Sequence, residues 1–155
     1  MRGKRAKVRK QALDRKYKNP IIGRLINKVM QGGKKSIAEE LVYKAVEGGA
    51  SKAKVEVVDF VNQVIDNVRP ALELRARRVG GANYQVPIPV SIIRQETLAV
   101  RWIVDIARSK SGKSFDKILM GELLSAFNGE GEAVKKKLDI ERMAEANKAF
   151  AHFRW

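Results

Sequence analysis

The feature that most constrains the fold is a change of hydrophobic periodicity at Leu72. Before it, apolar residues recur every three to four positions, as on helices. From Leu72 to Val90 they alternate with other residues, as on strands, and Gly80-Gly81 divides this segment in two. Two alternating runs around a Gly-Gly pair are typical of a β-hairpin. Two strands are too few for independent stability, so the root of the hairpin must pack on helices while its tip projects.

The rest of the chain predicts helices, each with residues that start or stop it. Asn19-Pro20 starts the first helix and Gly32-Gly33 stops it. A second is predicted from Ser36 to about Val46, ended by Gly48-Gly49, with Ile37, Leu41 and Val42 facing inward. Four more are predicted over 56–68, from Ser91 to about Lys110, from Ser114 to Phe127 and over about 132–148, before a short tail. The expected fold is mainly α, a bundle of about six helices with one projecting two-stranded β-hairpin arm.

Within the hairpin, the period of two predicts which side chains face the protein. We expect the apolar residues of both strands to face it and the arginines to point away; the first set is Leu72, Leu74, Val86 and Ile88, the second Arg75 and Arg77. Pro87 and Pro89 have no backbone N–H to donate to the ladder. The edge of the second strand to which their nitrogens point must therefore be left unpaired. Tyr84 either stacks on an exposed base or braces the turn, and the sequence leaves both alternatives open.

Positive charge is the strongest functional signal. The 155 residues include 32 Lys and Arg against 17 Asp and Glu, a formal net charge of +15, which favours binding to polyanions. Nine positive side chains and one negative fall in residues 1–18. This segment is predicted to be a basic arm that an anionic partner orders. Residues 19–155 are predicted to form a single helical domain, with the hairpin at about 72–90.

Several kinds of chemistry find no support in the sequence. No cysteine is present, and the one histidine, His152, has no second ligand beside it, so no metal site is predicted. GKS at 112–114 and GGKKS at 32–36 lack the first glycine of a P-loop. No run approaches the roughly 20 apolar residues of a membrane span. We therefore expect a protein that is not an enzyme, needs no cofactor and does not bind a membrane.

The distribution of the basic residues favours RNA over DNA. Each group could be an ordinary solvated surface, but together they suit a surface that follows phosphates. A DNA-reading protein would instead concentrate Arg, Asn and Gln on one recognition helix. The groups are the N-terminal arm, Lys34-Lys35, the hairpin arginines, the Arg94/Arg101/Arg108 helical stripe, Lys110–Lys113 and Lys135–Lys137. Of the acidic residues, Asp105 is expected to pair with Arg101. The alternatives are a free RNA-binding regulator and an RNA-processing enzyme.

Five segments, in order from about residue 20 to the C-terminus, resemble the bacterial ribosomal protein S-seven family, the universal seventh protein of the small subunit. They are INKVMQGGKKSIAEELVYKA, VRPALELRARRVGGANYQVP, LAVRWIV, KSFDKILMGELLSA and AVKKKLDIERMAEANKAFAHFRW. The resemblance implies a protein that binds small-subunit rRNA directly and nucleates assembly of the subunit's head. It also implies a place near the exit-site tRNA and the mRNA path, beside the ninth and eleventh small-subunit proteins, and not as a homo-oligomer. The ribosome is expected to be bacterial and cytoplasmic, with an organellar ribosome as the alternative.

The resemblance and the charge pattern together predict two sets of site residues. Those expected to bind rRNA are Arg5, Arg9, Lys10, Lys34, Lys35, Arg75, Arg77, Arg78, Arg94, Arg101 and Lys113. Those expected near the tRNA are Gly80, Gly81, Tyr84, Lys136, Arg142 and Lys148. The N-terminal segment and the return strand VPIPVSIIRQ depart from the family pattern, so the resemblance does not assign individual contacts there.

Overall fold

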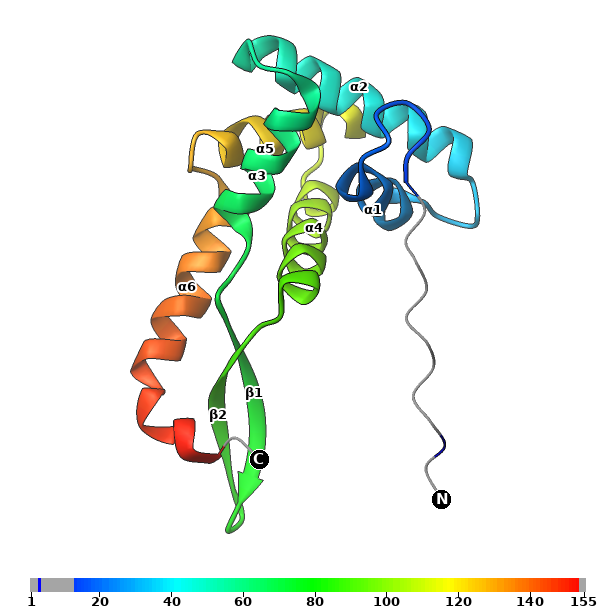
Figure 1. Cartoon of the computed structure of the whole chain (residues 1–155). Helices are drawn as coiled ribbons and strands as arrows, with labels where there is room; N and C mark the ends of the chain where they lie inside the picture. The colour runs from blue at the N-terminus through cyan, green and yellow to red at the C-terminus, as the bar shows by residue number, and fades with distance from the viewer. Residues whose placement is uncertain (1–2, 4–12, 154–155) are drawn as a thin grey trace.

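The computed structural model describes residue 3 and residues 13–153 (Figure 1). In this part of the chain, six α-helices and one 3-10 helix accompany a two-stranded antiparallel ribbon. The elements are α1 (Pro20–Val29), α2 (Lys35–Ala53), α3 (Val57–Val68), β1 (Leu72–Val79), β2 (Ala82–Pro89), α4 (Ile92–Ser109), α5 (Phe115–Phe127), α6 (Glu132–Ala146) and the 3-10 helix η1 (Lys148–Phe153). The prediction of a mainly α fold with one projecting hairpin is confirmed.

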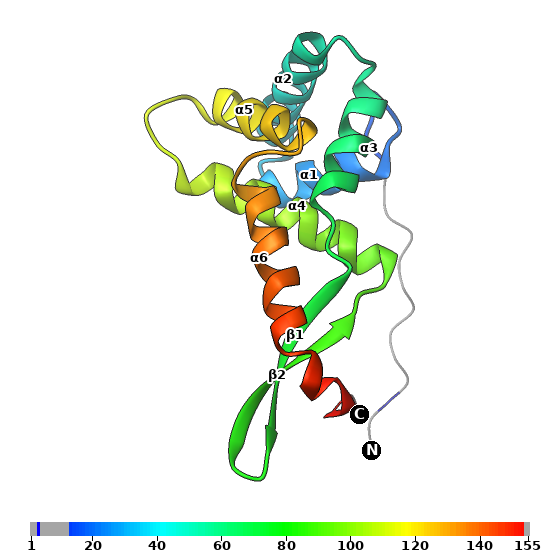
Figure 2. The ribbon, with the colours of Figure 1, turned by 90° about the vertical axis from the view of Figure 1, so that its left-hand side faces the viewer.

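Helices α1 to α5 form a body with one hydrophobic core, from which the ribbon and α6 extend together (Figures 1 and 2). Each of the five helices contributes side chains with no more than 1% exposure, among them Leu25, Val46, Phe60, Ile103 and Leu123. The first helix begins as predicted, because the side chain of its N-cap residue accepts hydrogen bonds from two N–H groups of the first turn. The ribbon is therefore anchored at its root on this helical body.

The prediction that α2 ends at Gly48-Gly49 is wrong. The helix continues to Ala53 and ends at Lys54, which has a left-handed φ of 58°. Gly49 faces α3 so closely that a Cβ there would lie 2.7 Å from the ring of Phe60. The glycine therefore permits two helices to approach rather than stopping one. Ile37, expected to face inward, is 53% exposed.

The ribbon closes through a two-residue turn in which Gly80 and Gly81 have φ of 58° and 90°. Val90 N–H donates to the Ala71 carbonyl at 3.1 Å just before the ladder begins. Because hydrogen-bonded and non-hydrogen-bonded pairs alternate, Pro87 and Pro89 fall at non-hydrogen-bonded positions, opposite leucines of β1. The prolines therefore remove no hydrogen bond from the ladder, as expected for a strand with one unpaired side.

The register corrects the predicted faces of the ribbon. Val86 lies opposite Arg75, and Tyr84 lies opposite Arg77, so these apolar and basic residues share one face. The leucines at the start of β1 share the other face with the two prolines. The arginines therefore do not all point away from the buried residues of β2, and Arg78 lies on the face opposite to Arg75.

The end of the chain, predicted only as a short tail, forms η1 and packs against β2. The ring of Tyr84 lies with its centroid 4.9 Å from that of Phe150 and 5.4 Å from that of Phe153. Val86 is fully buried in the same region. Tyr84 thus braces the ribbon against the C-terminal segment, which is one of the two alternatives that the sequence left open.

Candidate nucleic-acid interface

The distal part of the ribbon carries positive charge alone. It carries Arg75, Arg77 and Arg78, and no acidic residue occurs from position 74 to position 91. Arg75 and Arg78 are exposed on opposite faces, and the ribbon projects clear of the helical body (Figure 2). A polyanion that approaches the ribbon from either side therefore meets arginine.

At the root of the ribbon, two of the predicted RNA-binding arginines meet one carboxylate. Arg94, from the first turn of α4, donates through Nε and NH2 to the carboxylate of Glu73 on β1, at 3.1 and 3.3 Å. Arg75 Nε lies 3.5 Å from the same carboxylate. The hydrogen bond from Arg94 is the main cause that holds the pKa of Glu73 below its ordinary value. The carboxylate is therefore charged at neutral pH.

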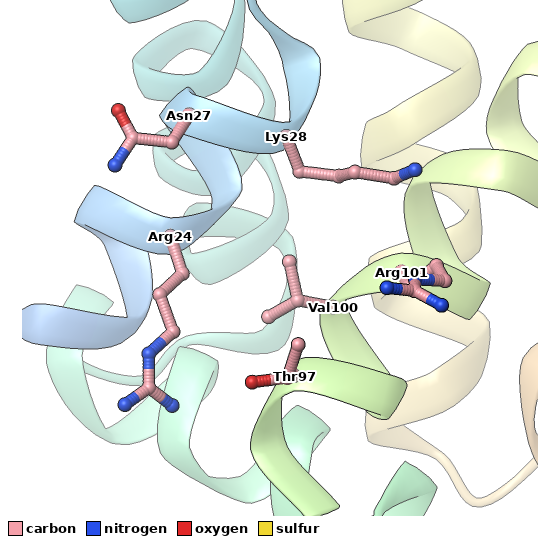
Figure 3. Close-up of a pocket in the computed structure, with 6 residues that line it drawn as sticks. All are labelled: Arg24, Asn27, Lys28, Thr97, Val100 and Arg101. Atoms are coloured by element: carbon pink, nitrogen blue, oxygen red, sulfur yellow. The ribbon is translucent and has the colours of Figure 1, made fainter. Parts of the chain in front are cut away.

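A groove of about 340 Å³ lies between α1 and α4, lined by Arg24, Asn27, Lys28, Thr97, Val100 and Arg101 (Figure 3). Arg24 pairs with Glu96, and Lys28 Nζ lies 2.9 Å from Asp105. The prediction that Arg101 pairs with Asp105 is wrong, because Asp105 pairs with Lys28 of α1 instead. Arg101 is exposed and makes no hydrogen bond or ion pair within residues 13–153. Its guanidinium is thus available to an external anion.

Arg108, the third arginine of the helical stripe, has a structural role instead. Its NH2 donates to the carbonyls of Lys28 at 2.9 Å and Val29 at 3.1 Å. These carbonyls close α1, where no further turn of helix supplies donors and the helix dipole favours a cation. Arg108 therefore joins the end of α4 to the end of α1.

Arg108→Ala is expected to lower the free energy of unfolding by about 1 kcal/mol, because it removes two charge-assisted hydrogen bonds at a helix end. Urea unfolding followed by circular dichroism measures this loss. The matched control is Arg101→Ala, one heptad earlier on the same helix, which should stay within about 0.5 kcal/mol of the wild type. Equal effects of the two substitutions would contradict the structural role of Arg108.

The remaining predicted rRNA contacts lie elsewhere on the body. Lys34 precedes α2, and Lys35 in its first turn lies 3.8 Å from Glu39. Lys113, in the α4–α5 loop, lines a hollow with Lys52 and Lys117. Helix α4, about 27 Å long for its 18 residues, separates this loop from the ribbon root. The predicted residues thus surround the body and ribbon rather than forming one cluster. Arg5, Arg9 and Lys10 lie outside the described residues.

The residues predicted to lie near the tRNA divide between the ribbon and α6. Gly80 and Gly81 form the tip of the ribbon, and Lys148 starts η1, which packs on β2 beside Tyr84. Arg142 lies 3.6 Å from Asp139 on the exposed side of α6. Lys136 lies nearer the body, with its Nζ 5.9 Å from the ring centre of Trp102. Ribbon, α6 and η1 nevertheless run side by side, so most of this set shares one end of the molecule (Figure 2).

Sequence reasoning missed Glu73, which organises the ribbon root. Its signal was present, because Glu73 is the one acidic residue between Asp66 and Glu96 in a segment rich in arginine. A lone acid among basic residues is expected to pair with one of them. Which arginines it meets depends on the packing of the ribbon root against α4.

The fold and the charges define a class: a basic, mainly helical protein whose projecting ribbon carries exposed arginines. Among the described residues, no group of three His, Cys, Asp or Glu side chains could hold a metal ion. No described helix combines the length and the apolar composition that crossing a bilayer requires.

Comparison with known proteins identifies the family. The sequence profile described as ribosomal protein S7p/S5e matches residues 1–148. The chain is 55% identical to small ribosomal subunit protein uS7 of Thermosipho africanus (strain TCF52B) and 50% identical to that of Fervidobacterium nodosum (strain ATCC 35602 / DSM 5306 / Rt17-B1), over all of both chains in each case. With the uS7 of Dichelobacter nodosus (strain VCS1703A) it shares 46% identity over 97% of each chain.

The chain belongs to the ribosomal protein S7p/S5e family, as the sequence resemblance predicted. It is a structural constituent of the small ribosomal subunit, acts in translation within the cytoplasmic ribosome, and is not an enzyme.

Proposed function

We propose that the protein binds the rRNA of the small-subunit head directly and nucleates assembly of that part of the subunit. The observation that carries the proposal is the ribbon, which holds three arginines and no acid beyond its root. Packing of η1 and α6 against it reduces the freedom that binding would otherwise remove, and such preorganisation favours affinity.

In this proposal the rRNA approaches the body from several sides. Arg94 and Arg101 on α4, Lys35 at the start of α2, and Lys34 and Lys113 in the loops join the ribbon arginines as contacts. The segment 1–18 acts as an arm that wraps the RNA, and 19–155 is the domain that carries it. Hydrogen bonds to Asp14 support a fixed base for this arm. The Asp14 carboxylate accepts them from the N–H groups of Lys16, Tyr17 and Asn19 at 3.1, 2.7 and 2.6 Å.

We further propose that the ribbon tip, α6 and η1 lie near the exit-site tRNA and the mRNA path. The ninth and eleventh small-subunit proteins are the proposed neighbours, and one copy of the chain serves each subunit. The support is the family resemblance together with the shared location of the ribbon tip and η1 at the end remote from the core (Figure 1).

Chemical protection mapping tests the proposal. The purified protein, added to naked small-subunit rRNA, is expected to protect nucleotides of the head domain and to remain with small subunits through a high-salt wash. Protection confined to other domains, or recovery only in the ribosome-free fraction, would contradict direct binding to the head. Hydrolysis or modification of the RNA by the pure protein would support an enzyme instead.

A further inference from the structure

Glu73 lies in a hollow of about 340 Å³ where the ribbon root meets the start of α4, lined by Arg75 and Arg94. The side chain of Glu73 is 21% exposed, that of Arg94 40% and that of Arg75 56%. The carboxylate is therefore recessed, while both guanidinium groups reach solvent. An anion that approaches this hollow meets the arginines first.

The hydrogen bonds of Arg94 determine which edge of its guanidinium group remains available to a ligand. Its Nε and NH2 both point at Glu73, which holds the plane of the guanidinium in one orientation. Its NH1 makes no hydrogen bond or ion pair within the described residues. The free edge of the group is therefore presented in a set direction.

We propose that Glu73 is a specificity-determining residue for RNA binding, because it orients Arg94 toward one phosphate position and repels phosphates elsewhere in the hollow. This inference rests on the proposed binding of rRNA through Arg75 and Arg94. An RNA with a phosphate opposite the free NH1 edge binds without disturbing the pair. Any other RNA must either break the Arg94–Glu73 pair or bring a phosphate against the carboxylate.

Two simpler roles for Glu73 predict different results. If it only fastens the ribbon to α4, its removal should weaken binding to every RNA and lower stability. If it is only a negative charge, its removal should tighten binding to every RNA by one factor. A specificity role predicts instead that its removal tightens binding to the wrong RNA and leaves binding to the right RNA nearly unchanged.

The experiment compares two RNAs of equal length, a head-domain rRNA fragment and a permuted sequence, by filter binding at fixed salt. Glu73→Gln keeps the size of the side chain and removes its charge. We expect the permuted RNA to bind up to about fivefold more tightly, the range that partly exposed ion pairs allow, and the head fragment to change by less than about twofold. Selectivity therefore falls severalfold.

Two further variants isolate the mechanism. Glu130→Gln, in the exposed α5–α6 turn where the side chain makes no ion pair with any other described residue, removes the same charge and should leave selectivity unchanged. In an Arg94→Gln background, Glu73→Gln should alter selectivity much less, since only the repulsion of phosphates by the carboxylate remains. Selectivity that survives Glu73→Gln, or that falls equally in both backgrounds, would overturn the inference. A wild-type protein that binds both RNAs equally would overturn the proposed function as well, which is a distinct result.

Discussion

Replacing Arg75, Arg77 and Arg78 together with alanine is expected to weaken binding to head rRNA by about 100-fold near physiological salt. Each phosphate that a protein neutralises releases counterions, so binding weakens as salt rises. Loss of up to three such contacts should also flatten the slope of log K against log salt by about two to three. Titrations of the head-domain fragment at several salt concentrations measure both quantities.

A matched control separates these contacts from the loss of charge as such. Lys28, Lys44 and Arg69 each pair with an acidic residue on the surface of the body. Their joint replacement by alanine removes the same three charges and should change the slope by less than about one. Thermal unfolding of both triple variants checks that the fold is intact, which matters because Arg77 is half-buried. A slope for the ribbon variant no flatter than that of the control would mean that the ribbon does not contact phosphates.

The register makes the ribbon prediction more specific. Arg75 and Arg77 share one face and Arg78 lies on the other, so RNA bound to one face cannot meet all three. If RNA contacts both faces, Arg78→Ala alone and the Arg75/Arg77 pair of substitutions should reduce the slope by about one and two. If only one face is used, one of these two variants should retain the wild-type slope.

The faces of the ribbon could have been predicted from the sequence. The prediction was wrong because it applied the alternation to each strand separately, without the register that the turn sets. A two-residue turn at Gly80-Gly81 pairs each even-numbered residue of β1 with an odd-numbered residue of β2. Leu72 must therefore share a face with Pro89, and Arg75 must share one with Val86. Alternation within a strand gives the pattern, but only the turn relates the two strands.

Other features of the site depend on contacts between distant segments. Arg108 reaches carbonyls 79 and 80 residues away in the chain, and Arg94 reaches a carboxylate 21 residues away. Local sequence patterns predicted the helix that carries these arginines, and their spacing predicted that they share one stripe of it. Which of them would bind an internal partner required the packing of α4 against α1 and against the ribbon root.

The glycines of α2 show the same limit in the core. A Gly-Gly pair is a frequent stop signal, and Gly32-Gly33 lie in the turn that follows α1, with both φ angles positive. Gly48 and Gly49 look identical in the sequence, yet both lie inside a helix. The difference is the neighbour: Gly49 lies against the ring of Phe60, whose side chain is fully buried.

Gly49→Ala and Gly121→Ala are expected to change stability in opposite directions. Both positions are inside helices, where alanine is favoured over glycine by about 1 kcal/mol. At Gly121 an added Cβ meets nothing within 4 Å, so the substitution should raise the free energy of unfolding by about 0.5–1 kcal/mol. At Gly49 the Cβ would lie 2.7 and 2.8 Å from two ring carbons of Phe60.

The ring has little room to give way, since its centroid lies 5.2 Å from that of Phe127 in the core. Overpacking of this kind costs about 1–3 kcal/mol and exceeds the gain in helix propensity, so Gly49→Ala should lose about 1–2 kcal/mol. Urea unfolding of the two variants measures both changes. Combining Gly49→Ala with Phe60→Leu, which removes the contacting ring, should abolish most of the additional loss. Stabilisation by Gly49→Ala, or a loss unaffected by Phe60→Leu, would mean that close packing on Phe60 is not the reason for glycine at this position.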